Sequence, residues 1–268
     1  MLSHHLLRIT TELSSIRFVS RLTGKFAKSK LSRRLIPFFA KTYQIRLDEA
    51  EFSLEKYPSL NAFFTRRLKN GIRSIDNEPS AIVSPVDARV TGIGSYLSDV
   101  SMFVKGQYYS IKELLPDPDL ANRFSEGHYV VLYLSPTDYH RIHSPLTGTW
   151  KMNWHVKGAV LPVHDKALTH VSHVLSRNER VITYIENENL DVAVIKVGAM
   201  NVASIKYTHP AGTSIGKGDE LAYFEFGSTV VLLIKPRDPE QTKFQWTPSL
   251  YEGDRVKMGE AIGQWKEI

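Results

Sequence analysis

The sequence predicts an α+β fold, in which a helical and basic N-terminal arm precedes a β-rich antiparallel body. Apolar residues recur at helical spacing within the first 46 residues. From about residue 80, short runs rich in β-branched and aromatic residues alternate with Gly, Pro and Asp turns. The charge follows the same division, because residues 1–46 hold ten Lys and Arg side chains and one acid, Glu12. The arm therefore carries +9, which leaves −3 for the rest of a chain whose net charge is +6.

The arm, residues 1–46, is expected to form amphipathic helices. Spacings of four and three place one set of apolar side chains on a single helix face, namely Leu2, Leu6, Ile9, Leu13 and Ile16. Leu31, Leu35 and either Phe38 or Phe39 continue the pattern, and Pro37 can kink or interrupt it. Such a basic amphipathic helix either lies in a membrane interface or packs on the protein's own core. The pattern leaves both open, but it gives no sign of a nucleic-acid-binding fold, so we expect no nucleic-acid partner.

The body, residues 47–268, is expected to consist of short strands. The runs that predict them are 81–83, 129–134, 180–185, 192–197, 202–207, 221–226 and 230–234, with one short helix at 112–115. Two Gly-Asp segments, 217–227 and 252–263, suggest hairpins. The second of them, together with residues 84–94, resembles the flattened barrel of biotinyl and lipoyl carrier domains. We therefore expect a barrel-sandwich hybrid, although the lysine that those carriers need at a hairpin tip is missing.

Composition excludes several kinds of site. The chain has no cysteine, which excludes disulfides, thiolate metal ligands and cysteine nucleophiles. It has no run of 18 apolar residues, so we expect no transmembrane helix, and the N-terminus does not predict a signal peptide. His164, His170 and His173 do not have the spacing of a standard metal site, and we expect no metal there.

Three segments could carry chemistry. Asp87 lies in the turn of SPVDARV, His140 and His143 lie in YLSPTDYHRIHSP, and Gly227-Ser228 interrupts the strand pattern of EFGSTVVLL. Each has a structural explanation when taken alone, because turn aspartates cap their own backbone and histidine pairs are often merely exposed. Together, an Asp, a His and a Ser can activate a hydroxyl. The chain lacks the G-x-S-x-G elbow of many serine hydrolases. A glycine directly before Ser228 instead favours attack of this hydroxyl on its own preceding carbonyl.

These segments resemble the phosphatidylserine decarboxylases, a family of pyruvoyl-dependent enzymes, in their prokaryotic form. The resemblance extends over residues 60–76, 84–90, 104–106, 133–145, 175–181, 197–205 and 226–230, and HRIHSP combined with GST is its most specific part. Two positions depart from the family pattern, since Ala88 replaces the usual Gly and Phe226 replaces a frequent Leu. Ala resists positive φ, so Ala88 bears on the geometry of the turn that holds Asp87.

The resemblance implies an enzyme that processes itself. Asp87 would orient His143, and His143 would deprotonate Ser228, whose hydroxyl attacks the carbonyl of Gly227. The cut would give chains 1–227 and 228–268, and Ser228 would become a pyruvoyl group that forms a Schiff base with the amine of the substrate. With this covalent pyruvate as its cofactor, the enzyme would convert phosphatidylserine to phosphatidylethanolamine and CO2 in phospholipid biosynthesis. His140 would either take part in the decarboxylation or anchor its loop.

The resemblance also implies where the protein works. We expect a peripheral position on the cytoplasmic side of the cell membrane, with an anionic membrane surface as partner, and the family resemblance allows a homodimer. Two alternatives stay open from the residues alone. One is a serine hydrolase that uses the same Asp, His and Ser, and the other is a membrane-binding homologue that does not mature. Both alternatives predict a single unbroken chain.

Overall fold

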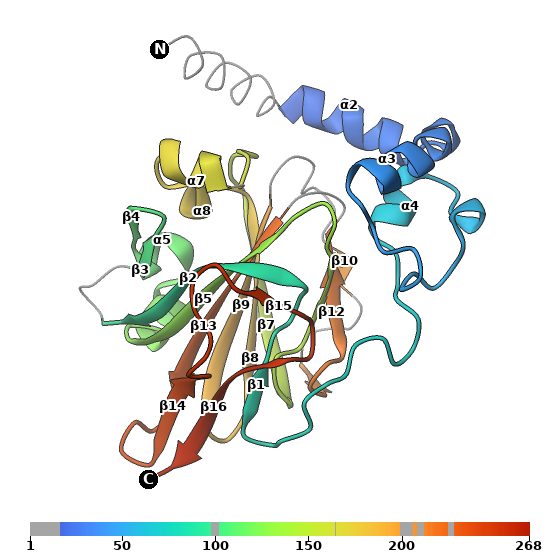
Figure 1. Ribbon diagram of the computed structural model, residues 1–268. Helices are drawn as coiled ribbons and strands as arrows, with labels where there is room; N and C mark the ends of the chain where they lie inside the picture. Colours follow the sequence, from blue (N-terminus) through green and yellow to red (C-terminus); the bar gives the residue numbers. More distant parts are fainter. Residues whose placement is uncertain (1–16, 98–101, 164, 199–205, 208–211, 225–227) are drawn as a thin grey trace.

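The computed structural model describes residues 17–97, 102–163, 165–198, 206–207, 212–224 and 228–268, and it has the expected α+β class (Figure 1). All pairings between its named strands are antiparallel, and none of the described sheets closes into a barrel. No helix within these ranges is long and apolar enough to cross a bilayer.

The N-terminal helices form a unit at one end of the body (Figure 1). They are α2 (Arg17–Lys28), the 3-10 helix η1 (Lys30–Leu35), α3 (Ile36–Thr42), the 3-10 helix η2 (Leu54–Lys56) and α4 (Leu60–Phe64). Pro37 lies in the first turn of α3, where its missing N–H does no harm, so it begins a helix and does not break one. A small apolar cluster joins residues on both sides of position 46, namely Ile36, Ala40, Ile45, Tyr57 and Phe63. The predicted stripe from Leu2 to Ile16 lies outside the described residues.

An eight-stranded sheet forms the centre of the body, in the order β11-β7-β8-β9-β13-β5-β2-β15. Its strands are β2 (Ala88–Tyr96), β5 (Gly127–Leu134), β7 (Gly148–Val156), β8 (Arg180–Glu186), β9 (Leu190–Gly198), β11 (Thr213–Ile215), β13 (Ser228–Pro236) and β15 (Arg255–Val256). Strands β9 and β13 are almost entirely buried, because both faces of the sheet are covered. Alternate residues of β13 enter two different apolar clusters, with Val231 on one face and Val230 on the other.

Smaller elements cover the two faces. Three sheets contain β1 (Ala81–Val83), β16 (Ala261–Glu267) and β14 (Thr242–Trp246), then β10 (Lys206–Tyr207), β12 (Glu220–Tyr223) and β6 (Arg141–His143), and finally β3 (Met102–Val104) and β4 (Gln107–Tyr109). The short helices are α5 (Ile111–Leu114), α6 (Pro118–Arg123), α7 (Asp165–His170) and α8 (Val174–Arg177). The helix predicted at 112–115 is therefore present as α5.

The two predicted hairpins are wrong. Gly218 lies between β11 and β12, but β12 pairs with β6 and β10, whereas β11 and the next strand, β13, both lie in the central sheet. In the same way β15 pairs with β2, and β16 pairs with β1 and β14. Gly218 and Gly259, both at positive φ, make the tight turns of these segments. The turns were recognised correctly, but they connect different sheets instead of adjacent strands of one sheet.

Candidate active site

Ser228 begins β13 and lies between two neighbouring strands, paired with Leu134 of β5 and Gly198 of β9. Its side chain points to the same face as Val230, whose apolar cluster also contains Ile142 of β6. The residue is fully buried, and its Oγ has no hydrogen-bond partner among the described residues. An unsatisfied buried hydroxyl costs about 1–3 kcal/mol. The adjacent Thr229 hydroxyl is buried and unpartnered as well, so burial alone does not assign a role to Ser228.

His143 ends β6 and is buried, with both ring nitrogens engaged. Its Nδ1 lies 2.7 Å from the carbonyl oxygen of Gly218, and its Nε2 lies 3.1 Å from the hydroxyl of Tyr139. A carbonyl only accepts, so Nδ1 carries the proton and the neutral ring accepts the Tyr139 proton at Nε2. Burial lowers the pKa of His143, an effect that the hydrogen bond to Gly218 partly offsets. The ring is therefore neutral at neutral pH, with a lone pair on Nε2, as a general base requires.

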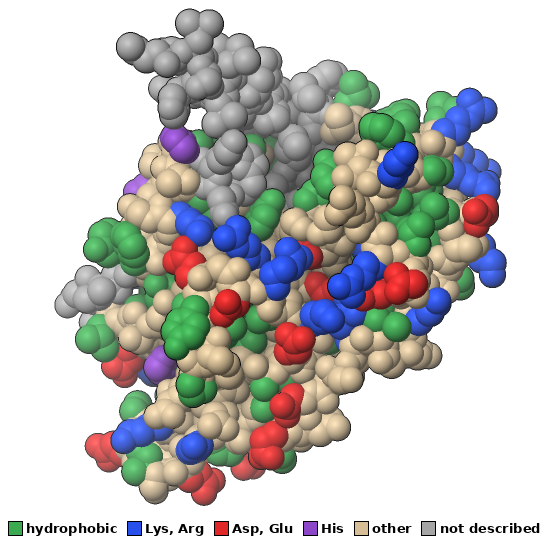
Figure 2. Space-filling model, in the orientation of Figure 1, with side chains coloured by type: hydrophobic (Ala, Val, Ile, Leu, Met, Phe, Trp, Pro, Cys, Tyr) green, Lys and Arg blue, Asp and Glu red, His purple; other side chains and the backbone are tan. Residues whose placement is uncertain are grey.

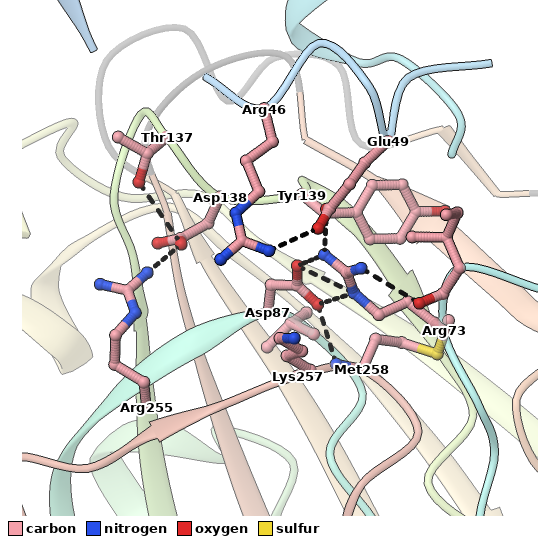
Figure 3. A network of polar contacts seen from close by, with 12 residues as sticks. Arg46, Glu49, Arg73, Asp87, Thr137, Asp138, Tyr139, Arg255, Lys257 and Met258 are labelled. Atoms are coloured by element: carbon pink, nitrogen blue, oxygen red, sulfur yellow. Dashed lines mark hydrogen bonds and ion pairs between the residues drawn. The ribbon is translucent and has the colours of Figure 1, made fainter. Parts of the chain in front are cut away.

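Asp87 lies in the turn directly before β2, in a network of charged side chains (Figure 3). Arg73 donates to its carboxylate from Nε at 3.0 Å and from Nη2 at 2.5 Å, and the backbone N–H of Met258 donates at 2.9 Å. Arg73 also donates to Glu49 at 2.8 Å, which in turn accepts from Arg46 at 2.8 Å. Burial opposes the charge of Arg73, but its hydrogen bonds with Asp87 and Glu49 outweigh burial and raise its pKa.

The structure does not join Asp87 to His143 by a hydrogen bond. The two are neighbours, because the backbone N–H of His143 donates to the carbonyl of Pro85 at 2.9 Å. Gly218, and not Asp87, receives the Nδ1 proton that fixes the His143 tautomer. Within the described ranges, Ser228 likewise has no hydrogen bond to His143, and Gly227 lies outside those ranges. The catalytic roles of Asp87, His143 and Ser228 stay predictions.

His140 is fully enclosed three residues before His143. Its Nδ1 lies 2.9 Å from the carbonyl oxygen of Asp138, so this nitrogen donates, and its Nε2 is buried without a partner in the described structure. The ring packs on Phe64 of α4 at a centroid distance of 4.0 Å. Burial lowers the pKa of His140 to about 3, and the ring is neutral at neutral pH. The backbone carbonyl of His140 also accepts from Phe224, which holds this loop against the segment that precedes Ser228.

Ala88 does not strain the turn beside Asp87. It is the first residue of β2, it pairs with Val256, and it is not among the residues at positive φ. A glycine is therefore not required at this position, and the methyl group of Ala88 is buried in an apolar cluster.

Three contacts of the candidate residues could not be assigned from the sequence. Tyr139 and Arg73 lie inside the segments that suggested the family, yet nothing in their spacing marks them as partners of His143 and Asp87. The carbonyl of Gly218 has no sequence signal, because every residue carries one. Among the described residues, no group of three His, Asp or Glu side chains could hold a metal ion, and His164 lies outside them.

The sequence model of the phosphatidylserine decarboxylase family matches residues 60–264, a range that includes Asp87, His140, His143 and Ser228. The chain belongs to the phosphatidylserine decarboxylase family. Curated relatives agree over nearly the full length. The phosphatidylserine decarboxylase proenzyme of Geobacillus kaustophilus (strain HTA426) is 41% identical over 262 residues, which cover 98% of this chain and 97% of that protein. The proenzyme of Bacillus thuringiensis (strain Al Hakam) is 41% identical over 257 residues, which cover 96% of each chain.

The comparisons confirm the predicted family membership. The word proenzyme in the names of these phosphatidylserine decarboxylases agrees with the expectation of a precursor that is cut. In a member of this family, a buried serine hydroxyl without a partner and a neutral histidine, whose Nε2 lone pair accepts from Tyr139, are groups that a self-processing reaction can use.

Proposed function

We propose that this chain is a phosphatidylserine decarboxylase that matures by cutting itself between Gly227 and Ser228. The observation that carries the proposal is the buried, unpartnered hydroxyl of Ser228 in a chain of this family. In the uncut chain this hydroxyl is fully enclosed, which suits attack on the adjacent peptide bond, because that reaction needs no access from outside. After the cut, the new end of β13 has to open to the lipid amine.

His143 is the proposed base of the cut. As the oxygen of Ser228 attacks the carbonyl carbon of Gly227, its proton must be accepted, and the Nε2 lone pair of His143 can accept it. The hydroxyl of Tyr139 occupies this lone pair at 3.1 Å. The proton therefore reaches the ring either through Tyr139 or after the phenol has rotated away. Gly218 keeps Nδ1 protonated throughout, and Arg73 keeps the neighbouring carboxylate of Asp87 in place.

Ser228 is also the proposed source of the pyruvoyl group. This group would stand at the new end of β13, where pairing with Leu134 and Gly198 holds the backbone. The buried position of Ser228 fits a reactive carbonyl that must be kept from water. When present, the group supplies an electron sink for the loss of CO2 from the carbon that bears the substrate amine. His140, neutral and with a free Nε2, is the proposed proton carrier of this part of the site.

The N-terminal helices are proposed to hold the enzyme at an anionic membrane surface. Among the residues predicted to share one side, Leu31 is 68% exposed, Leu35 42% and Phe38 72%, whereas Phe39, the alternative to Phe38, packs against the N-terminal cluster. Leu22 and Phe26 of α2 are exposed as well. Basic side chains lie between them, namely Lys25, Lys28, Lys30, Arg33, Arg34 and Lys41. Figure 2 shows hydrophobic and basic groups side by side over this end of the molecule. This combination supports contact with a lipid interface over packing on the protein's own core.

Decarboxylation of the lipid tests the proposal. Purified protein mixed with phosphatidylserine vesicles should form phosphatidylethanolamine and CO2, and the Ser228→Ala variant should form neither. A wild-type chain that stays intact and instead reacts with acyl-serine reagents at Ser228 would support the hydrolase. An intact and inert chain that binds anionic vesicles would support the non-maturing homologue.

A further inference from the structure

A pocket of about 400 Å³ lies beside the candidate site. Asp87 and Tyr139 form part of its wall, so it extends to the hydroxyl that contacts His143. The N-terminal unit closes it on one side through Tyr43, Gln44, Arg46 and Glu49, and the turn after β15 closes it on the other. Figure 3 shows how the charged side chains of this region face one another. The volume is that of a site for a small molecule or a lipid head group.

Cations exceed acids in the wall of this pocket. The cations are Arg46, Arg66, Arg73, Arg255 and Lys257, and the acids are Glu49, Asp87, Asp138 and Glu260. Three of the arginines have carboxylate partners, since Arg46 pairs with Glu49, Arg73 with Glu49 and Asp87, and Arg255 with Asp138. Within the described structure, no acid lies at salt-bridge distance from Arg66 or Lys257. The remaining acid, Glu260, accepts from the backbone N–H of Lys257 at 2.8 Å, so the wall has one positive charge in excess, and Arg66 is its buried unpaired cation.

Arg66 is unusual because its charge is buried. It is only 4% exposed, and its Nη2 donates to the carbonyl of Thr137 at 3.3 Å. Its Nε and Nη1 are enclosed and have no hydrogen-bond partner. The ring of Phe63 lies 5.3 Å from the guanidinium carbon. Burial lowers the pKa of Arg66, but a guanidinium stays protonated in proteins. An unpaired buried charge costs several kcal/mol, so an anion that enters the pocket would remove a large penalty.

We propose that Arg66, assisted by Lys257, binds the phosphate diester of the lipid head group, an inference that rests on the proposed function. The head group has two anions, the phosphate and the carboxylate of its serine. A cation on the carboxylate would stabilise the substrate more than the transition state, because this charge disappears as CO2 leaves. The phosphate keeps its charge throughout the reaction, and guanidinium groups match its geometry. Arg66 therefore anchors the part of the lipid that does not react.

Head-group binding can be measured without turnover. The Ser228→Ala variant keeps the chain uncut and unreactive, so calorimetric titration with glycerophosphoserine reports binding alone. In this background Arg66→Met should weaken binding by about tenfold or more, the loss of one charge-assisted contact. Lys257→Met, an exposed position, should weaken binding severalfold. Arg67→Met is the matched control, because Arg67 is the next residue, lies outside the pocket and pairs with Glu220. It should leave binding unchanged.

Two further ligands identify the anion. Free serine has the carboxylate without the phosphate diester and should bind weakly, with no dependence on Arg66. Inorganic phosphate should bind more weakly than glycerophosphoserine. Equal, Arg66-dependent affinity for inorganic phosphate would make this a free-phosphate site and overturn the lipid assignment. Arg66-dependent binding of serine would assign the residue to the carboxylate and overturn it as well.

Stability separates a binding role from a structural one. Because two of its nitrogens are unpaired, Arg66→Met should unfold in urea at the same or a higher midpoint than its parent in the absence of ligand. When the native Ser228 is kept, the Arg66→Met protein should still cleave itself. Its KM for the lipid should rise, and its kcat should stay unchanged. Unchanged glycerophosphoserine binding in a folded Arg66→Met protein contradicts the inference. If Arg66→Met does not fold, unchanged glycerophosphoserine binding by Lys257→Met contradicts the inference instead. Failure of the wild-type chain to cleave would contradict the proposed function. It would not change the measured binding of glycerophosphoserine, so the two failures can be told apart.

Discussion

The Nδ1 atom of His143 lies 2.7 Å from the carbonyl oxygen of Gly218, and this contact decides which ring nitrogen can act as a base. Because Nδ1 must donate here, Nε2 keeps its lone pair whenever the ring is neutral. A backbone carbonyl thus performs the orienting task that the Asp-His-Ser pattern assigned to Asp87. Asp87 is held by Arg73 instead, at the wall of the neighbouring pocket.

The pH dependence of self-cleavage should follow His143. Burial lowers its pKa below the ordinary value of 6.5, so the neutral, base-competent ring persists to lower pH than in a free histidine. The first-order rate of cleavage should stay constant from about pH 8 to about pH 6.5 and decrease only at more acidic pH. The rate can be followed on denaturing gels after refolding at each pH. A decrease centred above the ordinary histidine value would contradict the assignment, and His143→Ala should not cleave at any pH.

Arg73 should matter more for stability than its neighbour Arg46. Arg73→Met leaves the carboxylates of Asp87 and Glu49 without their buried cation and should cost about 3 kcal/mol of unfolding free energy. Arg46→Met removes an exposed partner of the same Glu49 and should cost less than about 1 kcal/mol. Urea unfolding of both variants in the uncut Ser228→Ala background measures this difference. Equal costs would mean that Asp87 does not depend on Arg73.

His140 should make the fold sensitive to acid. Burial lowers the pKa of His140 to about 3 in the folded protein, whereas an unfolded histidine titrates near 6.5. Between these two pH values the unfolded chain therefore binds a proton at this residue and the folded chain does not. The stability that depends on a neutral His140 is present above pH 6.5 and is lost as the pH falls toward about 3. Between pH 7 and pH 5 this loss should amount to about 2 kcal/mol.

His140→Gln removes that titration and keeps a polar side chain of similar length. In the Ser228→Ala background, the His140→Gln protein should lose about 2 kcal/mol less than its parent between pH 7 and pH 5. Because His143 and the acids titrate in both proteins, their contributions cancel in the comparison. The same acid loss in both proteins would show that His140 is not held neutral.

Membrane binding should depend on the charge of the N-terminal helices. Arg33→Glu with Arg34→Glu reverses two cations, each worth about 1 kcal/mol near an anionic surface. The partition coefficient on phosphatidylglycerol vesicles, which contain no substrate, should fall by about tenfold or more, and high salt should weaken wild-type binding. Lys243→Glu with Lys266→Glu makes the same charge change on exposed residues near the C-terminus and should have little effect. Unchanged co-sedimentation of the Arg33 and Arg34 variant would place the membrane contact elsewhere.

Strand positions were readable from the sequence because strands such as Ala81–Val83 and the run within β13 are continuously apolar and β-branched. The partners of the strands could not be predicted from the sequence, as the two incorrect hairpins show. A turn at Gly218 or Gly259 looks the same whether the chain then returns to its own sheet or enters another one. Pairing is settled by burial against distant strands, which no local pattern contains.

The sequence identified the candidate residues of the site by their chemistry, but it did not predict which groups they contact. Asp87, His143 and Ser228 stand out because their side chains can exchange protons. The partner of His143 is a backbone carbonyl, and the partner of Asp87 is an arginine 14 residues away. Arg66 has a buried and unpaired charge only because Phe63 and the Thr137 loop enclose it, a property of packing that the sequence does not express.

The mass of the purified chain tests the central claim most directly. After incubation at neutral pH, the account predicts two chains, residues 1–227 and residues 228–268. The smaller chain should lack an amino group at its first residue and should resist Edman sequencing, since a pyruvoyl end has no amine. The Ser228→Ala protein, treated identically, should remain a single chain. A wild-type protein that still has the mass of the whole chain after long incubation would contradict self-cleavage and, with it, the proposed origin of the cofactor.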